Sequence, residues 1–241
     1  MREIPTEEKR GLIFAVLDGS SVPDIDAHLG AELAEEIEGF NWAGLRMVSQ
    51  ETLSFRANWK QAVDSFGENY HVPYLHPTTI FPMTLASSMC LDYFGPHVRL
   101  VFGMEAIAEI RQEPERWAAA DIGRHLFPVY NIFPNMSLTV TEGALAAFQT
   151  VPGRTPGECR VVYTKMIDPA LPPEHLAAVS AYMDFNWNEV VKAQDLPIIE
   201  GVWRSLSGGL CDEVIFGSNE APLQVFHRDF DRLVDPAPAA H

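Results

Sequence analysis

The stretch that decides how this chain folds and what it carries runs from Asn58 to Pro77, NWKQAVDSFGENYHVPYLHP. His71 and His76 lie five residues apart among aromatic side chains, and Asp64 and Glu68 precede them. Imidazole is the commonest metal ligand in proteins, and two neutral imidazoles with one carboxylate hold non-haem Fe(II) while leaving coordination positions open. The stretch therefore predicts two of the three ligands of such a site.

The five-residue spacing requires a break in helical geometry. In a straight helix it turns the two side chains apart by about 140° beyond a full turn, so they cannot meet at one ion. Pro73 and Pro77 disfavour helical geometry in the residues before them. We expect a helix that carries His71 at its end and an irregular turn that brings His76 back. The alternative is two unrelated histidines in a buried aromatic cluster.

A third ligand is suggested by the helix predicted after Pro173. Trp187, Val191, Ile198 and Val202 form an apolar stripe in that helix, and Asp195 falls on it. A carboxylate on a buried face is costly unless it is paired or coordinated. Pro197 predicts a kink nearby, close to Ala193. The pattern leaves two possibilities open, a metal ligand or a carboxylate that pairs with Arg204 or faces water.

The rest of the chain predicts an α+β fold, with an antiparallel sheet flanked by helices. We expect one domain over residues 1–241 with a flexible tail at 235–241. Strands are expected at 11–17, 43–56, 98–104, 136–141, 144–151 and 159–167, with a hairpin at Gly143. Helices are expected at 24–37, with Asp24 as N-cap and Ile25, Leu29, Leu33 and Ile37 on the buried face, at 58–70 with Asn58 as cap, from Pro173 to about Leu206, and at 219–234.

Composition narrows the function classes. The 241 residues are 47% hydrophobic, enough for a sizeable core, and the net charge of −16 argues against a nucleic-acid partner. The apolar run at 11–17 is too short to span a membrane, so no membrane is expected. Three separated cysteines, Cys90, Cys159 and Cys211, form no disulfide framework and no C-x-x-C pair, which favours the cytoplasm.

These motifs resemble a known family. The segment N-W-K, then Glu68, Tyr70-His71 and His76-Pro77, is similar to the signature of the catalytic domain in the alpha subunit of Rieske-type aromatic-ring-hydroxylating oxygenases. Downstream, Phe133-Pro134-Asn135, Gln194-Asp195 with Glu200, and Gly217 to Glu220 with Phe226-His227-Arg228 resemble further segments of that family. The similarity is clearest from about residue 40 onward.

The resemblance implies roles for individual residues. It makes His71, His76 and Asp195 the ligands of a mononuclear Fe(II). It gives Glu68 a catalytic role, because in the family an acid at this place bridges to the Rieske cluster of a neighbouring subunit. Tyr70 is expected to pack near the site. The implied fold is a helix-grip-like catalytic domain, and the implied activity is O₂-dependent hydroxylation or demethylation of an aromatic or other apolar substrate, as in aromatic hydrocarbon catabolism by mono- and dioxygenases.

Departures from the family concern neighbours of the ligands and the electron supply. Asp64-Ser65 and Gln194 stand where the family usually has Asn and an acid, and Trp203 stands where Gln is common. A Rieske [2Fe–2S] cluster needs C-x-H and C-x-x-H pairs, and neither occurs here. We therefore expect no Rieske domain in this sequence, so that turnover needs an external cluster on a ferredoxin or Rieske-bearing protein. A fragment, a split gene or a lost electron path all remain open, and the resemblance suggests a homotrimer.

Two alternatives remain at this point. A chain without a Rieske domain can be a non-catalytic protein that binds a hydrophobic ligand on the same fold. Two histidines and a carboxylate also suit catalytic Zn²⁺, although no glutamate stands at the spacing that zinc proteases use.

Overall fold

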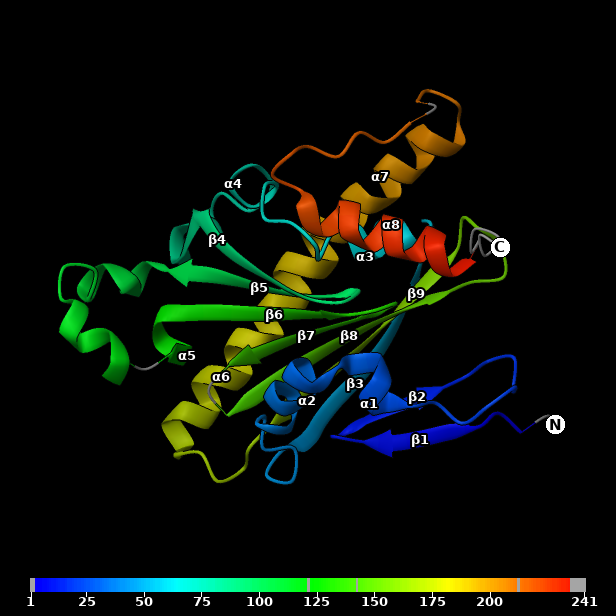
Figure 1. Cartoon of the computed structure of the whole chain (residues 1–241). Helices are drawn as coiled ribbons and strands as arrows, with labels where there is room; N and C mark the ends of the chain where they lie inside the picture. Colours follow the sequence, from blue (N-terminus) through cyan, green and yellow to red (C-terminus); the bar gives the residue numbers. More distant parts are fainter. Residues whose placement is uncertain (1–2, 121, 142, 212, 235–241) are drawn as a thin grey trace, which may run out of the picture.

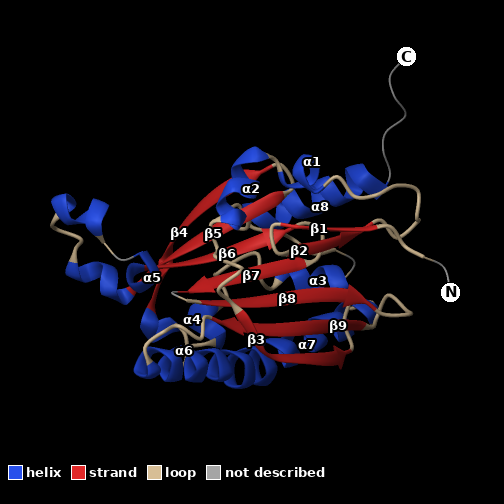
Figure 2. Cartoon of the chain, turned by 90° about the horizontal axis from the view of Figure 1, so that it is seen from below, coloured by secondary structure: helices blue, strands red, loops and turns tan. Residues whose placement is uncertain are grey.

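A seven-stranded antiparallel sheet forms the centre of the molecule, seen in Figures 1 and 2. The computed structural model describes residues 3–120, 122–141, 143–211 and 213–234. The strand order is β3-β9-β8-β7-β6-β5-β4. β3, the first of these seven strands in the sequence, is an edge strand and pairs with β9, the last. A separate hairpin pairs β1 with β2. The strands are β1 (Thr6–Lys9), β2 (Leu12–Ala15), β3 (Arg46–Phe55), β4 (Thr84–Phe94), β5 (His97–Met104), β6 (Leu126–Ile132), β7 (Met136–Thr141), β8 (Ala144–Pro152) and β9 (Cys159–Ile167).

Both faces of the sheet are covered by helices, which confirms the predicted α+β class. Successive side chains of a strand point to opposite faces. On β8, Ala144, Ala146 and Phe148 join one buried cluster with the long helical region at 173–207. Leu145 of the same strand joins the opposite cluster, with α1 (Ile25–Leu29) and α2 (Ala31–Glu38).

The helix expected over 24–37 is two helices. Gly30 separates α1 from α2 with a positive φ of 72°, a conformation that glycine adopts without steric cost. The expected N-cap is confirmed, because the Asp24 carboxylate accepts a hydrogen bond from Ala27 N. The predicted apolar face also holds across the break, with all four residues almost fully buried: Ile25, Leu29, Leu33 and Ile37.

The long helix expected from Pro173 has three parts. α6 (Pro173–Phe185) continues into a π-helical segment (Asn186–Asp195), and α7 (Leu196–Ser207) follows without a gap. At the second junction Leu196 N donates to Val191 O, five residues back. Pro197 has no N–H to donate and is the second residue of α7. The irregularity expected near Ala193 is therefore a widened helix that carries Asp195 at its end.

The remaining helices surround the Asn58–Pro77 stretch. Asn58 caps α3 (Trp59–Asp64) by accepting from Lys60 N, as expected, but α3 ends at Asp64 and does not reach Tyr70. α4 (Val72–Leu75) is a single turn, α5 (Ile122–His125) precedes β6, and α8 (Ala221–Val234) closes the described chain. Short 3₁₀ turns occupy Phe81–Met83, Glu105–Glu109 and Pro114–Ala119. In the part of the chain that the structure describes, no helix has the length and apolar character needed to cross a membrane.

Candidate metal centre

His71 and His76 flank the single turn α4. His71 is its N-cap residue with helical dihedral angles, and His76 is its C-cap residue with φ −115° and ψ 39°. The expected order was therefore wrong: the helical turn lies between the two histidines, and the longer helix ends upstream at Asp64. The departure of His76 from helical geometry removes the divergence that a straight helix would impose.

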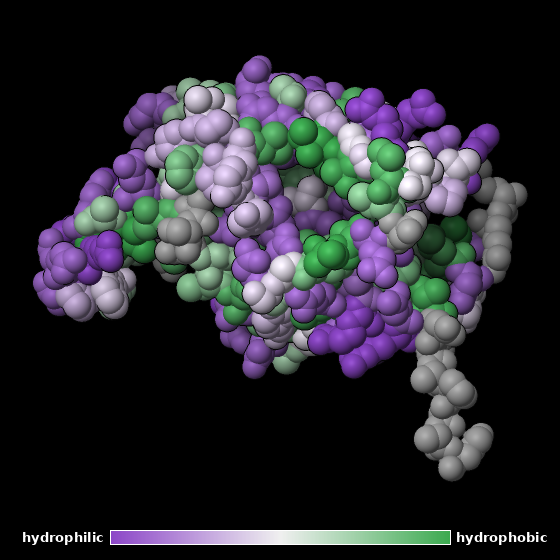
Figure 3. All heavy atoms as spheres, turned by 90° about the horizontal axis from the view of Figure 1, so that it is seen from above, coloured by the Kyte–Doolittle hydropathy of each residue, from purple (hydrophilic) through white to green (hydrophobic). Residues whose placement is uncertain are grey.

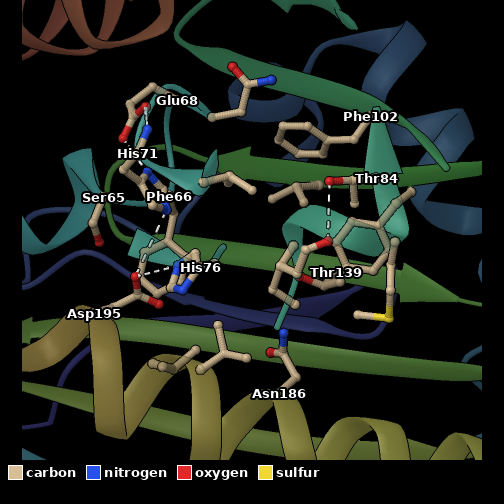
Figure 4. A pocket seen from close by; sticks show the side chains of 18 of the residues that line it. Ser65, Phe66, Glu68, His71, His76, Thr84, Phe102, Thr139, Asn186 and Asp195 are labelled. Atoms are coloured by element: carbon tan, nitrogen blue, oxygen red, sulfur yellow. Dashed lines mark hydrogen bonds and ion pairs between the residues drawn. The ribbon is translucent and has the colours of Figure 1, made fainter. Parts of the chain in front are cut away.

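The two imidazoles meet Asp195, which comes from the π-helical segment far along the chain (Figure 4). His76 Nε2 lies 3.0 Å from Asp195 Oδ1, and His71 Nε2 lies 3.8 Å from the same oxygen. One ligand-type atom of each residue lies within 4.8 Å of the others. The structure therefore brings two nitrogen donors and one oxygen donor to a common point, as a facial set of ligands requires.

The other nitrogen of each imidazole has an acceptor of its own. His71 Nδ1 donates to Glu68, which also accepts from His71 N at 3.1 Å. His76 Nδ1 donates to Gln194 Oε1 at 2.6 Å, and Thr79 Oγ1 donates to the same oxygen at 3.2 Å. These bonds hold both Nε2 lone pairs toward Asp195, the arrangement that metal-binding histidines usually show. In the sequence, Gln194 was noted only because the family usually has an acid at this place. Its contact with His76 gives it a positioning role.

The centre is sheltered and favours positive charge. The His76 side chain is 2% exposed and that of Asp195 is 14% exposed, whereas His71 reaches 27%. Burial lowers the pKa of His76, but the hydrogen bond and charge of Asp195, with Gln194, outweigh it, so the net shift is upward. A cation between these side chains would meet the same attraction. The chemistry of the donor set therefore fits a metal ion.

Only half of the apolar stripe expected around Asp195 is buried. Trp187 and Val191 are buried in the core, but Ile198 and Val202 are 51% and 43% exposed. The widened π-helical turns shift the register, so the two halves of the stripe do not share one face. Arg204 does not pair with Asp195 among the described interactions. Tyr70, expected to pack near the site, is 58% exposed and packs against Tyr74 with the two rings tilted and their centroids 5.5 Å apart.

A cavity of about 130 Å³ opens directly beside the three side chains. Its middle is apolar, and Figure 4 shows Phe66 and Phe102 along it. The apolar lining comes from α4, β5, β6, β8 and the π-helical segment, among other elements: Phe66, Val72, Ile80, Met83, Phe102, Met104, Phe127, Val129, Phe148, Val190 and Val191. The arrangement provides a largely apolar compartment next to the ligand set.

A second, larger hollow of about 570 Å³ reaches the same centre from another side. Glu68, His71 and Asp195 line both spaces. The second hollow, called the α7 groove here, is bounded by α3, α7, α8 and the segment before α8. Figure 3 shows hydrophobic side chains beside a hollow on this face, and the apolar residues are Leu75, Ile198, Ile199, Val202, Trp203, Leu206, Val214, Ile215, Phe216 and Leu223.

A histidine–aspartate pair lies in the wall of the α7 groove. His227 Nε2 is 3.0 Å from both carboxylate oxygens of Asp64, and Phe216 stacks on the His227 ring with centroids 5.0 Å apart. Burial raises the pKa of Asp64, against the opposing effect of His227. The two residues belong to segments singled out in the sequence, and the structure places them next to the candidate centre without making them ligands.

Comparison with known proteins gives one family. Residues 42–235 match the family described as the ring hydroxylating alpha subunit, catalytic domain. No curated protein matches the chain.

Solved structures give the same fold at low sequence identity. A quaternary ammonium Rieske monooxygenase, CntA, in complex with an inhibitor, has a TM-score of 0.75 at 14% identity and covers 95% of this chain and 61% of its own. Naphthalene 1,2-dioxygenase from Rhodococcus sp. bound to indole has a TM-score of 0.71 at 17% identity, over 97% of this chain and 67% of its own. The chain thus spans about three fifths of the length of the first of these relatives.

Proposed function

Because this chain belongs to the family of ring-hydroxylating alpha-subunit catalytic domains, we propose that it is the catalytic part of a non-haem iron oxygenase. In this proposal His71, His76 and Asp195 hold one Fe(II), and the neighbouring cavity holds an aromatic or other apolar substrate that is hydroxylated or demethylated with O₂. The convergence of the three donor atoms beside an apolar cavity is the observation that supports it most.

The ligand set favours iron over zinc. Three protein ligands leave adjacent coordination positions open, and Fe(II) bound there supplies the electron chemistry that activates O₂. In zinc proteases with two histidine ligands, a nearby glutamate acts as general base for the metal-bound water. Glu68 is the other carboxylate in the described lining of the cavity, but it already accepts two hydrogen bonds from His71. It is therefore engaged in orienting a ligand and is poorly placed to take a proton from water.

The chain's own residues prepare the site in three ways. Glu68 and Gln194 fix the tautomers of His71 and His76, so that each Nε2 keeps its lone pair for the metal. The aromatic and aliphatic walls of the cavity exclude water from the reacting carbon. Because the three candidate ligands line one part of the cavity, a substrate in the cavity lies beside the open coordination positions without binding the metal.

Electrons are proposed to enter through Glu68 from a Rieske [2Fe–2S] cluster outside this chain. The Glu68 carboxylate contacts His71 and also lines the α7 groove, where its side chain is 12% exposed. A ferredoxin or a Rieske-bearing protein that seats on this face would therefore reach the ligand His71 through one carboxylate. We further propose a homotrimer, and a cytoplasmic setting that suits the free thiols of Cys90 and Cys211.

The proposal is tested by turnover with isotopically labelled oxygen. The protein is loaded with Fe(II) and incubated with a reduced Rieske-type ferredoxin, ¹⁸O₂ and small aromatic probes such as toluene, indole and acetophenone. Incorporation of ¹⁸O into a product, lost in His76→Ala, is the expected result. Tight binding of a probe without iron and without any labelled product would favour the alternative, a hydrophobic-ligand binding protein.

A further inference from the structure

The π-helical segment gives the cavity a second functional end. Tyr182, Asn186, the adjacent pair Val190 and Val191, and Asp195 all line the cavity, so lining positions recur every four or five residues. In an α-helix each residue turns by about 100°, so Asn186 and Asp195 would point about 180° apart. Hydrogen bonds to the fifth residue back widen the turn to about 4.4 residues, so nine residues complete about two turns. The π-helix is thus the reason that Asn186 and Asp195 face the same space.

Polar side chains occupy two separate parts of the cavity. One end holds the three candidate ligands with Glu68. Figure 4 shows Thr84, Thr139 and Asn186 at a distance from that cluster, with Phe66 beside the cluster and Phe102 on the side of Thr84. A molecule bound along the cavity would therefore place an apolar body in the middle and a hydrogen-bonding group at the end remote from the metal.

Asn186 is the group best suited to recognise that remote end. It is partly buried, and its side-chain amide points into the cavity in Figure 4. Among the described residues its amide makes no hydrogen bond to protein, whereas Asn188, two residues on, donates to Asp184 O at 2.8 Å. Thr84 already donates, at 3.4 Å, to Ile80 O. A sheltered amide offers one acceptor and two donor hydrogens, and leaving them unpaired when substrate displaces water costs free energy.

The charge of the lining limits the recognised group to an uncharged one. Within the described part of the chain no Lys or Arg lines the cavity, and its two acids, Glu68 and Asp195, belong to the metal end. The residues at the remote end carry no charge at neutral pH, since burial raises the pKa of the Tyr182 phenol to about 12. An ionic substituent there would be buried without a counter-charge, which is strongly unfavourable.

The volume limits the ring system. The cavity measures about 130 Å³, and an engineered apolar cavity of about 150 Å³ in another protein takes up a single benzene molecule. One six-membered ring with a small substituent fits this space, whereas two fused rings require the walls to move.

We propose that Asn186 is the specificity-determining residue of this cavity, hydrogen-bonding one uncharged polar substituent, such as a carbonyl or hydroxyl, of a single-ring substrate whose opposite edge faces the candidate ligands. The inference rests on the proposed function in one respect only, the statement that the edge of the substrate facing the candidate ligands is the one that reacts. The preference for a neutral, single-ring ligand with a polar group follows from the cavity itself.

Three probes of nearly equal size separate the effect of a hydrogen-bonding oxygen from the effects of shape and of charge. Acetophenone carries a carbonyl, α-methylstyrene replaces that oxygen with a methylene, and benzoate replaces the acetyl group with a charged carboxylate. Binding is measured by calorimetry on the Fe(II)-loaded protein under nitrogen and again on the metal-free protein. The variants are Asn186→Leu, which keeps side-chain size, and Asn188→Leu, the same substitution at an exposed position of the same segment.

The wild type is expected to bind acetophenone about fivefold or more tighter than α-methylstyrene, the scale of one hydrogen bond, and to bind benzoate far more weakly. A fourth probe, the two-ring ketone 2-acetonaphthone, should also bind far more weakly than acetophenone. Asn186→Leu should abolish that preference while binding α-methylstyrene at least as well, and Asn188→Leu should keep it. An unchanged preference in Asn186→Leu, no preference in the wild type, or benzoate bound as tightly as acetophenone would each overturn the proposal. Loss of iron or of turnover with the preference intact would refute the proposed function and leave this inference standing.

Discussion

Gln194 Oε1 accepts a hydrogen bond from His76 Nδ1 over 2.6 Å, and Gln194 is the neighbour of Asp195 in the chain. One segment of helix therefore supplies one candidate ligand and orients another. The last turn of the π-helix links the two functions, because it fixes both residues on adjacent positions of a widened backbone.

Removing this acceptor should weaken metal binding without unfolding the protein. Gln194→Leu leaves His76 free to rotate and to change tautomer, and we expect a loss of about 10–100-fold in Fe(II) affinity, the usual effect of losing such a partner. Gln194→Glu retains an oxygen acceptor and should bind Fe(II) at least as well as the wild type. Competition with a chromophoric chelator measures both, and equal affinities for Gln194→Leu and the wild type would argue against the positioning role.

Glu68 should matter for turnover more than for iron content. Glu68→Gln keeps an oxygen that accepts from His71 Nδ1 but removes the charge that lies between the α7 groove and the ligand. We expect near-normal iron content and a fall of about 10–100-fold in the rate of product formation with a Rieske-type donor. A variant that loses iron and activity in parallel would show that Glu68 serves only to hold His71.

The convergence of the three candidate side chains was predicted better than the structure around them. Residue type and family resemblance brought His71, His76 and Asp195 together, and the structure places all three within 4.8 Å. The path between them was wrong in detail, because Glu68 to Tyr70 continue the polar and aromatic pattern of a helix although α3 stops at Asp64. Helix periodicity also assumed 3.6 residues per turn, so it missed the π-helix and with it the cavity-facing position of Asn186.

Several strands lie close to their expected positions, including the mostly exposed β3. β9 matches the expected 159–167, and its buried residues alternate with exposed or partly buried ones. β4 and β6 were not predicted: β6 contains Pro128, and β4 mixes small and polar side chains that carry no clear alternation. β1 was missed because its four residues, Thr-Glu-Glu-Lys, are polar and its pairing depends only on β2.

Acidic pH should destabilise the fold through His97, which is fully buried between α1 and the Phe133 loop. His97 Nε2 donates to His28 O at 2.7 Å, and Nδ1 accepts from Phe133 N at 3.0 Å, so the ring must be neutral. Burial lowers its pKa to about 4. In the unfolded chain this histidine binds its proton near pH 6.5. The contribution of His97 to the free energy of unfolding is therefore fully present above that pH and is lost as the pH falls toward 4.

The expected size of this effect is about 2 kcal/mol between pH 7 and pH 5. Urea unfolding at the two pH values measures it, in the wild type and in His97→Phe. The variant is expected to be less stable at pH 7, since two hydrogen bonds are lost, but its stability should change less with pH. An equal pH dependence in both proteins would assign the effect to other groups.

Core packing on the α1–α2 side should govern stability without affecting the metal centre. Leu138 of β7 is fully buried in the cluster that includes Ile37 and Leu145. Leu138→Ala should cost about 2–5 kcal/mol of unfolding free energy, through lost burial and a cavity. Ile13→Ala, at a side chain 69% exposed, should stay within about 0.5 kcal/mol. Both variants should keep wild-type iron content below their melting temperatures; selective loss of iron in Leu138→Ala would link the core to the centre.

The most direct test of the account is the metal content of purified protein reconstituted with Fe(II) under nitrogen and desalted. Inductively coupled plasma mass spectrometry should give about one iron per chain in the wild type, and well under a tenth of that in His71→Ala, His76→Ala and Asp195→Ala. Asp64→Asn, which alters the neighbouring pair with His227 but no proposed ligand, should retain the wild-type content. Full iron content in any of the three ligand variants, or none in the wild type, would contradict the claim that these side chains share one metal ion.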